Sequence, residues 1–310
     1  MVFLGIDTSN YTTSVAVTDG KKVLVNAKKL LPVGQGERGL RQSDAVFSHL
    51  KNMPEVVRAV GKTDGIAAVG VSVSPRDAEG SYMPCFLAGV SHAEMLSSLL
   101  GVPLYRFSHQ RGHIRAALYS AGCEELIGGE YLAFHVSGGT TEALHVKNGV
   151  ITLVGKTADI SAGQAIDRVG VALGLSFPAG AALEKLALSA EGEKLPEKPR
   201  ITVRDGVCNL SGLENKAQTF LKKGVSPGVI ALYTLTAVRD TLVKMSEQIT
   251  EKHPGLPILY AGGVMSDKMI RGALSASFDA RFAEPEYASD NAAGIALLTA
   301  DRYFSENHGE

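Results

Sequence analysis

The chain has 310 residues, of which 45% are hydrophobic and 20% are charged, a composition that excludes disordered, collagenous and coiled-coil proteins. Its 31 lysine and arginine residues against 32 aspartate and glutamate residues give a net charge of −1, so no global field attracts it to nucleic acid or to an anionic membrane. Because single hydrophobic cores stop growing near this length, we expect two lobes.

The first elements along the chain form a pattern that occurs twice. An apolar strand at 3–6 leads into a polar turn at 7–13, and a strand at 14–17 is joined by Asp19-Gly20 to another at 22–25. The same order returns as strand 131–136, polar turn 137–142, strand 143–146, Asn148-Gly149 and strand 150–154. Asp-Gly and Asn-Gly favour hairpins, because a type I′ turn needs a positive φ at both central residues. The repeat predicts a duplicated fold.

The chain between and after these hairpins is predicted to be mainly helical. We expect helices at 42–59, 87–100, 114–120, 162–173, 228–252, 266–274 and 291–304, with a kink at Pro54 and the greatest length at 228–252. Apolar runs at 104–107 and 258–261 predict two further strands. The glycine-rich segment 31–39 and the charged segment 191–207 have the composition of surface loops.

The cysteines and the N-terminus bear on the compartment. Cys85, Cys123 and Cys208 lack CxxC spacing, which argues for a reducing compartment and against a disulfide framework or a thiolate zinc site. No apolar run reaches about 18 residues, and the N-terminal strand ends at Asp7, unlike a signal peptide. We therefore expect a cytoplasmic protein without a membrane segment.

The polar turns have the residues of a phosphate-binding site. Small residues at Ser137, Gly138, Gly139 and Thr140 leave backbone N–H groups and hydroxyls free to surround an anion, although a hairpin that merely prefers glycine has the same pattern. Asp7 and Ser9 occupy the matching turn of the first half. Two such turns facing each other across a cleft would hold a polyphosphate, as in actin-like and sugar-kinase-like ATPases.

A third glycine-rich segment follows the strand at 258–261. There Gly262 and Gly263 would let the adenosine of a nucleotide lie against the backbone. The three segments occur in the order that this fold requires. We therefore expect an α/β protein with a duplicated actin-like ATPase fold, which is ribonuclease H-like, and two lobes around a nucleotide cleft.

A histidine pair suggests a metal centre. His109 and His113 lie one helical turn apart, so both imidazoles could bind one ion, although exposed histidines at a helix start would have the same spacing. Asp290, at the start of the last predicted helix, could supply an acidic third ligand. Two histidines and one aspartate would leave open positions, as catalytic metal sites do.

Six ordered motifs then resemble those of the tRNA threonylcarbamoyladenosine transferases, formerly classified as O-sialoglycoprotein endopeptidases. The resemblance spans nearly the whole chain. It lies in 4–9, the His109/His113 pair, 136–139, 163–169 with 173–175, 178–187 with 211–213, and 261–264 with 290–293. It implies an actin-like lobe at 1–106, completed by the helix at about 291–310, and a second lobe at 107–290.

The resemblance also implies roles for single residues. His109, His113 and Asp290 match the ligands of one divalent ion, iron or zinc. Ser137, Gly138, Gly139, Asp167 and Gly180 match positions that hold ATP or an adenylate, with Asp167 facing the ribose hydroxyls and Glu184 one helical turn beyond Gly180. A sister enzyme of the family makes threonylcarbamoyl-adenylate, and tRNA and further partner subunits are implied as partners.

Five departures from the family pattern indicate a divergent paralogue. Asn10-Tyr11-Thr12 replaces a Cys-Asp-Glu run, and residues 74–80 replace a Gly-Pro-Gly loop. Arg111 replaces the acid between the histidines, Thr140 replaces a histidine, and Asp267, which is still expected among the nucleotide- or substrate-binding residues, replaces an asparagine. The predicted metal and nucleotide residues are kept while the acceptor side differs.

The sequence therefore favours a metal-dependent, adenylate-binding carbamoyl transferase resembling the enzyme that acts on N6 of a tRNA adenosine. A carbamoyltransferase with a different acceptor, or a non-catalytic scaffold that binds nucleotide and metal, are the alternatives. A protease is disfavoured, because the His-x3-His pair lacks the glutamate of an HExxH site. Short lysine pairs and 6% aromatic residues do not decide whether RNA is bound directly.

Overall fold

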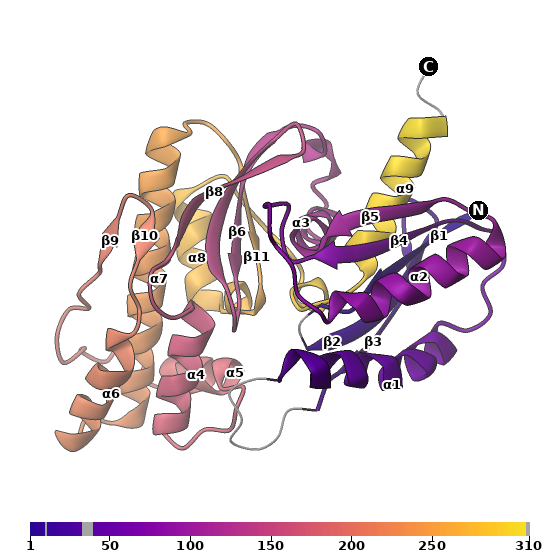
Figure 1. Cartoon of the computed structure of the whole chain (residues 1–310). Helices are drawn as coiled ribbons and strands as arrows, with labels where there is room; N and C mark the ends of the chain where they lie inside the picture. The colour runs from indigo at the N-terminus through magenta and orange to yellow at the C-terminus, as the bar shows by residue number, and fades with distance from the viewer. Residues whose placement is uncertain (10, 33–39, 308–310) are drawn as a thin grey trace. The chain divides into compact units, whose positions relative to one another are not determined.

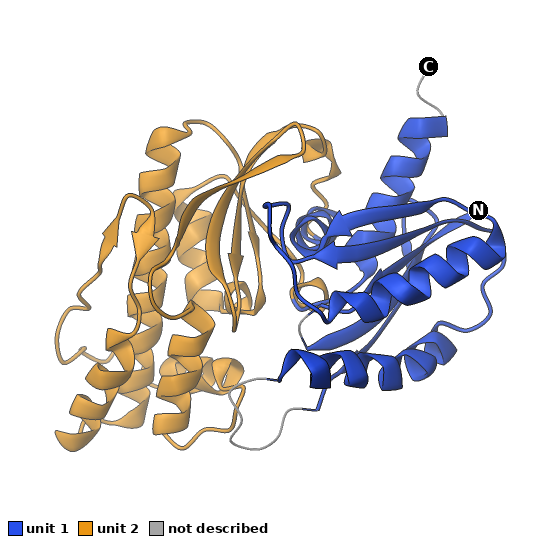
Figure 2. Ribbon diagram, viewed as in Figure 1, with its two compact units in different colours: residues 1–120, 289–310 blue, residues 121–288 orange. Residues whose placement is uncertain are grey.

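A computed structural model describes residues 1–9, 11–32 and 40–307 of the chain. Within it the chain divides into two compact units, which Figure 2 shows in two colours. Unit 1 comprises residues 1–120 and 289–310, and unit 2 comprises residues 121–288. Most of the loop expected at 31–39, and Asn10 of the first polar turn, lie outside the described residues.

Unit 1 is built on a five-stranded sheet in the order β3-β2-β1-β4-β5. Its antiparallel part consists of β1 (Val2–Asp7), β2 (Thr12–Thr18) and β3 (Val23–Leu30). Its parallel part adds β4 (Ile66–Ser74) next to β1 and β5 (Leu104–Ser108) at the edge. The helices of this unit are α1 (Gln42–Val60), α2 (Phe86–Leu100), α3 (His109–Ser120) and α9 (Ala293–Asn307), labelled in Figure 1.

Strand alternation decides which residues of β1 reach the functional site. Successive side chains of a strand point to opposite faces of the sheet. Leu4 and Ile6 are buried in the core that Met53 of α1 and Ala93 of α2 also enter. The opposite face packs on α9 so closely that a Cβ on Gly5 would lie 2.4 Å from the Ala296 nitrogen. Asp7 comes two residues after Gly5 in β1, so its side chain points to this second face.

Unit 2 contains a seven-stranded sheet in the order β12-β11-β6-β7-β8-β10-β9. Its strands are β6 (Glu130–Val136), β7 (Thr141–Lys147), β8 (Val150–Thr157), β9 (Val203–Arg204), β10 (Val207–Cys208), β11 (Ile258–Ala261) and β12 (Ala280–Phe282). Its helices are α4 (Ala162–Ala172), α5 (Gly180–Leu188), α6 (Gly212–Lys222), α7 (Pro227–Lys252) and α8 (Lys268–Ser277). Three short 3-10 helices occupy Glu124–Leu126, Gly263–Ser266 and Pro285–Tyr287.

The predicted duplication is confirmed by the strand order. In each sheet three antiparallel strands are followed by two parallel strands on the side of the first one. The order β8-β7-β6-β11-β12 of unit 2 repeats β3-β2-β1-β4-β5 of unit 1. The extra strands β9 and β10 extend the second sheet beyond β8.

Most predicted helices are present with ends shifted by a few residues. The longest is α7, whose side chains are mostly buried in the core of unit 2, and Ser226 caps its N-terminus by accepting from the Val229 N–H. The helix expected at 114–120 begins earlier, at His109, and α1 continues through Pro54 as one helix. Six further elements of the structure had not been expected from the sequence: β4, α5, α6, β9, β10 and β12.

The boundary between the units differs from the expected one. The sequence placed α3 and Asp290 in the second lobe, whereas the structure places both in unit 1. The physical reason is the packing of α3 on α9, where a Cβ on Gly294 would lie 1.8 Å from the Gly112 carbonyl oxygen. All three expected metal ligands consequently belong to one unit. Among the described residues, none of the helices is both long and apolar enough to span a membrane.

Candidate metal centre and glycine-rich turns

The three expected metal ligands lie together at one end of the unit 1 sheet. β5 ends at Ser108 and α3 begins at His109, so His109 and His113 occupy the first turns of the helix on the same side. Their ring centroids are 4.2 Å apart. Asp290 comes just before α9, the helix that packs against α3. The side chains of the three residues are mostly buried, with exposed fractions of 18%, 9% and 21%.

The distances between the donor atoms suit a single metal ion. Asp290 Oδ1 lies 3.4 Å from His109 Nε2 and 3.2 Å from His113 Nε2, and the three ligand atoms lie within 4.8 Å of one another. Nitrogen and oxygen atoms bound about 2.0–2.1 Å from one ion in tetrahedral geometry would lie about 3.3 Å apart. The three residues therefore fit a divalent ion, and this donor set suits both iron and zinc.

The electrostatics of the centre couple His109 to two carboxylates. Burial by itself would raise the pKa of the Asp290 carboxyl, because it disfavours the charged carboxylate. Hydrogen bonds and charge interactions with His109 and His113 outweigh burial and hold this pKa well below its ordinary value. Burial also disfavours a charged His109, yet Asp7 and Asp290 outweigh it and raise the pKa of His109 to about 10. A metal ion would therefore bind here in exchange for a proton.

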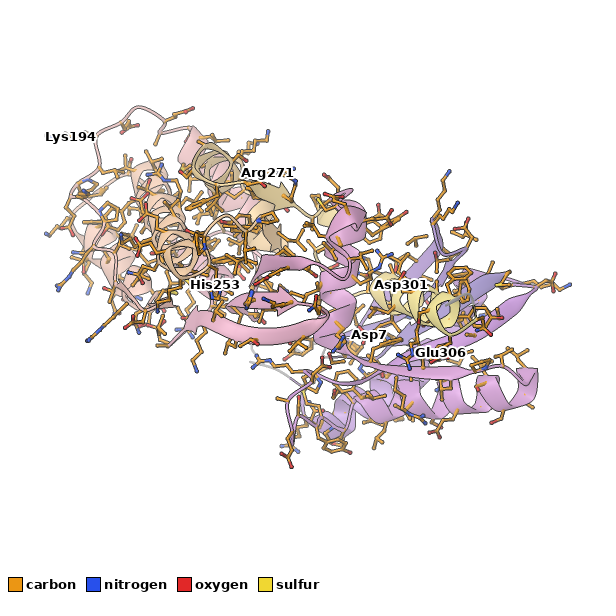
Figure 3. The ribbon with its side chains drawn as sticks, turned by 90° about the horizontal axis from the view of Figure 1, so that it is seen from above. Asp7, Lys194, His253, Arg271, Asp301 and Glu306 are labelled. Atoms are coloured by element: carbon orange, nitrogen blue, oxygen red, sulfur yellow. The ribbon has the colours of Figure 1, made fainter. Side chains whose placement is uncertain are left out.

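Asp7 lies behind His109 at the end of β1 and is fully buried. Its Oδ2 is 3.0 Å from His109 Nδ1 and accepts a hydrogen bond of 2.7 Å from Ser9 Oγ, while Ser72 Oγ of β4 donates to Oδ1. The sequence assigned Asp7 and Ser9 to nucleotide binding. The structure brings both into the hydrogen-bond network of His109, and Figure 3 labels Asp7.

The segment after β4 is attached to the start of α3. The Gln110 N–H donates to the Pro75 carbonyl oxygen at 3.1 Å, and Arg111 pairs with Asp77. Two of the departures from the family pattern, at 74–80 and at Arg111, are therefore in contact with each other. The sequence analysis found each departure separately but not the ion pair that joins them.

In unit 2, the turn at Ser137, Gly138, Gly139 and Thr140 connects β6 to β7. Ser137 Oγ accepts from the N–H groups of Gly139 and Thr140, and the Ser161 hydroxyl at the start of α4 donates to the Gly138 carbonyl. A Cβ on Gly138 or Gly139 would meet nothing within 4 Å. The turn therefore presents open backbone beside a helix N-terminus.

The next two candidate residues follow in α4 and α5. Asp167 Oδ1 accepts a hydrogen bond of 2.7 Å from the Ala179 N–H, immediately before Gly180. Burial raises the pKa of the Asp167 carboxyl, partly offset by this bond. A Cβ on Gly180 would meet nothing within 4 Å. The structure thus brings Asp167 close to the Gly180 backbone.

The remaining candidates lie around the start of α8. Gly262 has a φ of 103° and lies so close to β6 that a Cβ there would be 2.2 Å from the Val136 oxygen, whereas a Cβ on Gly263 would meet nothing within 4 Å. Asp267 caps α8 by accepting from the Ile270 N–H, and Glu184 accepts from the Lys268 N–H. One oxygen of each carboxylate is thus used by the backbone of α8.

Solved structures of the same overall fold place the protein in a class. Component A of the (R)-2-hydroxyglutaryl-CoA dehydratase of Acidaminococcus fermentans matches with a TM-score of 0.60 and 19% identity over 97% of this chain and 98% of that chain. HypF of T. kodakarensis matches with a TM-score of 0.61 and 13% identity over 99% of this chain and 48% of that chain. A ROK family glucokinase of Streptomyces griseus matches with a TM-score of 0.55 and 10% identity over 97% of this chain and 100% of that chain. The protein has the actin-like ATPase fold expected from the sequence.

The family is shown by the sequence comparisons. A family model described as tRNA N6-adenosine threonylcarbamoyltransferase matches residues 44–297. Proteins of that name are 30% identical in Thermosipho melanesiensis, over 96% of this chain and 93% of the relative, and 31% identical in Pyrobaculum aerophilum, over 96% and 85%. The relative in Geobacillus kaustophilus is 29% identical over 95% of this chain and 89% of the relative. The chain belongs to the tRNA N6-adenosine threonylcarbamoyltransferase family, a family of transferases.

Proposed function

We propose that this protein is a metal-dependent, adenylate-binding transferase that moves a threonylcarbamoyl group to N6 of a tRNA adenosine. Family membership supports the transferase chemistry and tRNA as the acceptor. The observation that carries the metal dependence is the convergence of His109, His113 and Asp290 within 4.8 Å of one another. The open glycine-rich turns of unit 2 support the binding of an adenylate.

The proposed reaction exchanges one bond to the carbamoyl carbon for another. The N6 amine of the adenosine attacks the carbonyl carbon of threonylcarbamoyl-adenylate, the new N–C bond forms, and the C–O bond to the phosphate breaks. AMP leaves with the bonding electron pair, and the amine loses one proton. A divalent ion held by His109, His113 and Asp290 would act as a Lewis acid toward the phosphate or carbamoyl oxygen.

The residues of unit 2 would bind the adenylate. The Gly138 N–H, which the hydrogen bonds of Gly139 and Thr140 to Ser137 do not use, can donate to a phosphate oxygen, aided by the partial positive charge at the start of α4. Asp167 uses one oxygen for the Ala179 N–H, which leaves the other as an acceptor for ribose hydroxyls. Gly263 would let the adenosine lie against its backbone.

A second candidate function is carbamoyl transfer to an acceptor other than tRNA. The observation that favours it is the contact between two departures from the family pattern: Arg111, between the metal-binding histidines, pairs with Asp77 of the altered 74–80 segment. A neutral ion pair thus stands where the family pattern has an acid, which alters the charge that an incoming acceptor meets. A metal- and nucleotide-binding scaffold is the outcome expected if binding persists without turnover for any acceptor.

The decisive experiment is nucleoside analysis of tRNA incubated with the protein, threonylcarbamoyl-adenylate and candidate partner subunits. The proposal expects threonylcarbamoyladenosine to form, and to be lost with the His109→Ala and His113→Ala variants. Formation of AMP with an unmodified tRNA, when another amine or hydroxyl acceptor is added, would favour the second candidate. Binding of AMP or ATP without release of AMP would favour the scaffold.

A further inference from the structure

We propose that Asp7 is a positioning residue of the metal centre, which fixes the orientation and tautomer of His109 so that Nε2 faces the ion. This inference rests on the metal centre of the proposed function. It reassigns Asp7 from a nucleotide ligand to the carboxylate partner of a metal-binding histidine.

The Asp7 side chain is completely buried. Its exposed fraction is 0%, and both oxygens are used: Oδ1 by Ser72, and Oδ2 by Ser9 and His109. A buried carboxylate is tolerated only when hydrogen bonds or an opposite charge compensate the loss of water. With no exposed surface, Asp7 is placed to act through His109 and not on a nucleotide.

The His109 ring turns Nδ1 toward Asp7 and Nε2 toward Asp290. Nδ1 lies 3.0 Å from Asp7 Oδ2, whereas Nε2 lies 3.4 Å from Asp290 Oδ1. A carboxylate has only acceptor oxygens, so Nδ1 must carry the hydrogen in this contact. The lone pair of neutral His109 is therefore on Nε2, which points at the other two ligands.

The support of Asp7 is rigid. Asp7 is the last residue of β1, and its backbone pairs with Ser14 of β2, whose hydroxyl donates to the Asp7 carbonyl oxygen. Ser72 reaches the carboxylate from β4. Two neighbours of the sheet thus hold the carboxylate in place, and it in turn holds an imidazole from α3. Precise ligand placement requires this kind of support from fixed elements.

Asp7 also balances the charge of the centre. A divalent ion bound by two neutral histidines and Asp290 alone would leave one uncompensated positive charge in a mostly buried centre. Asp7 supplies the second negative charge through His109, so the ion and the two carboxylates sum to zero. Burying a balanced set of charges costs less than burying an unbalanced one.

The test is Co²⁺ titration of the purified full-length protein, monitored by the visible absorption of the bound ion. Asp7→Asn keeps the size of the side chain but removes its charge, and we expect Co²⁺ affinity to fall 10–100-fold, the usual effect of losing an outer-shell carboxylate. The absorption spectrum of the bound ion should change as well, because the ring of His109 is no longer fixed. Thr18→Val is the matched control, since it removes the hydrogen bond from a buried β2 hydroxyl to the Lys22 carbonyl oxygen, opposite Phe3 and at the other end of β1 from Asp7. Its affinity should stay within about twofold of the unsubstituted protein.

A second measurement does not depend on the folding of a variant. In the unsubstituted protein labelled with ¹⁵N-histidine and loaded with Cd²⁺, the coupling between cadmium and nitrogen should appear at Nε2 of His109, with a hydrogen retained on Nδ1. Coordination through Nδ1 would overturn the proposal. So would an Asp7→Asn variant with unchanged affinity and spectrum.

These outcomes separate the inference from the proposed function. If the unsubstituted protein binds no Co²⁺, or binds it equally well after His113→Ala, the metal centre itself is wrong. If His113→Ala loses the ion while Asp7→Asn keeps it unchanged, only the role of Asp7 is wrong.

Discussion

Arg115 of α3 donates to both carboxylate oxygens of Asp301 of α9, at 2.7 Å from Nε to Oδ2 and 3.3 Å from Nη2 to Oδ1. Figure 3 labels Asp301 on the yellow helix α9. Arg115 is 4% exposed. The pair joins the helix that carries His109 and His113 to the helix that follows Asp290. It therefore fixes the distance between expected metal ligands that are far apart in the sequence.

Replacing Asp301 by alanine should destabilise unit 1 and weaken the metal centre. The substitution leaves the buried Arg115 without its carboxylate, which costs about 1–3 kcal/mol, less than for a fully buried pair because the Asp301 side chain is 35% exposed. Urea unfolding would measure the free energy of unfolding, and Co²⁺ titration the affinity. The double variant Arg115→Met with Asp301→Leu should recover much of the lost stability, because no buried charge remains. A single Asp301→Ala variant as stable as the unsubstituted protein would contradict this account.

Gly294 should be intolerant of any side chain. An added Cβ would lie 1.8 Å from the Gly112 carbonyl oxygen, so Gly294→Ala must push α3 and α9 apart. We expect a loss of about 2–4 kcal/mol, as for other overpacked sites, together with a lower affinity for metal. Gly272 is the matched control, because it lies in α8 and a Cβ there meets nothing within 4 Å. Gly272→Ala should raise the free energy of unfolding by about 0.5–1 kcal/mol.

The three expected metal ligands were accessible to sequence reasoning for a specific physical reason. Two histidines at i and i+4 share a helix face whatever the tertiary fold, and an acid before a late helix is visible as a motif. The partner of His109 was not accessible, because Asp7 is distant in sequence and reaches it only through strand pairing. The role of Asp7 needs the alternation of β1 side chains and the placement of Ser72 on β4, which only the folded sheet supplies.

Charge exchange between Arg111 and Asp77 should test how firmly the 74–80 segment is attached. Both side chains are 37% exposed, so we expect a coupling free energy of about 0.2–1 kcal/mol. Arg111→Glu should lower the free energy of unfolding because it faces Asp77 with a like charge. The exchange variant Arg111→Glu with Asp77→Arg should restore most of the loss. A double-mutant cycle in urea gives the coupling directly, and additive effects would show that the pair is not formed in solution.

Acid should remove a contribution to stability that Asp159 makes at neutral pH. Burial opposes ionisation, but hydrogen bonds from Ser211 and from the N–H groups of Leu210, Ser211 and Ile160 hold the pKa of the Asp159 carboxyl well below its ordinary value. A carboxyl whose pKa is lowered in the folded state stabilises the protein at pH values above its pKa in the unfolded chain, which is about 3.9 for aspartate. This contribution is lost as the pH falls further, toward the lower pKa of the folded state.

The measurement is the free energy of unfolding of Asp159→Asn at several pH values. We expect the variant to be less stable by about 1–2 kcal/mol at pH 7, a modest value because Asp159 is exposed to solvent. The difference should stay constant down to about pH 5 and shrink below about pH 4. A difference that grows on acidification has the wrong sign and would refute the assignment.

The fold was predictable where one segment carries its own signal. The two hairpins have Asp-Gly and Asn-Gly turns, and α7 has a long apolar face, so both appeared in the sequence analysis. In contrast, β9 and β10 contain two residues each and exist only because β10 pairs with β8. The division between the units was misplaced because the contact of α3 with α9 depends on Gly112 and Gly294, which periodicity does not reveal.

The two glycines that follow β11, Gly262 and Gly263, should respond differently to alanine. Gly262 has a positive φ and a Cβ there would lie 2.2 Å from the Val136 oxygen, so Gly262→Ala should destabilise unit 2 by about 2 kcal/mol or more. Gly263 is exposed and an added Cβ meets nothing within 4 Å, so Gly263→Ala should leave the free energy of unfolding within about 0.5 kcal/mol. If the adenosine lies against this backbone, the same methyl group should weaken AMP binding about tenfold, or about 1.4 kcal/mol, by calorimetry. A Gly263→Ala variant that is stable and binds AMP normally would place the adenosine elsewhere, because the added methyl group would then be clear of the ligand.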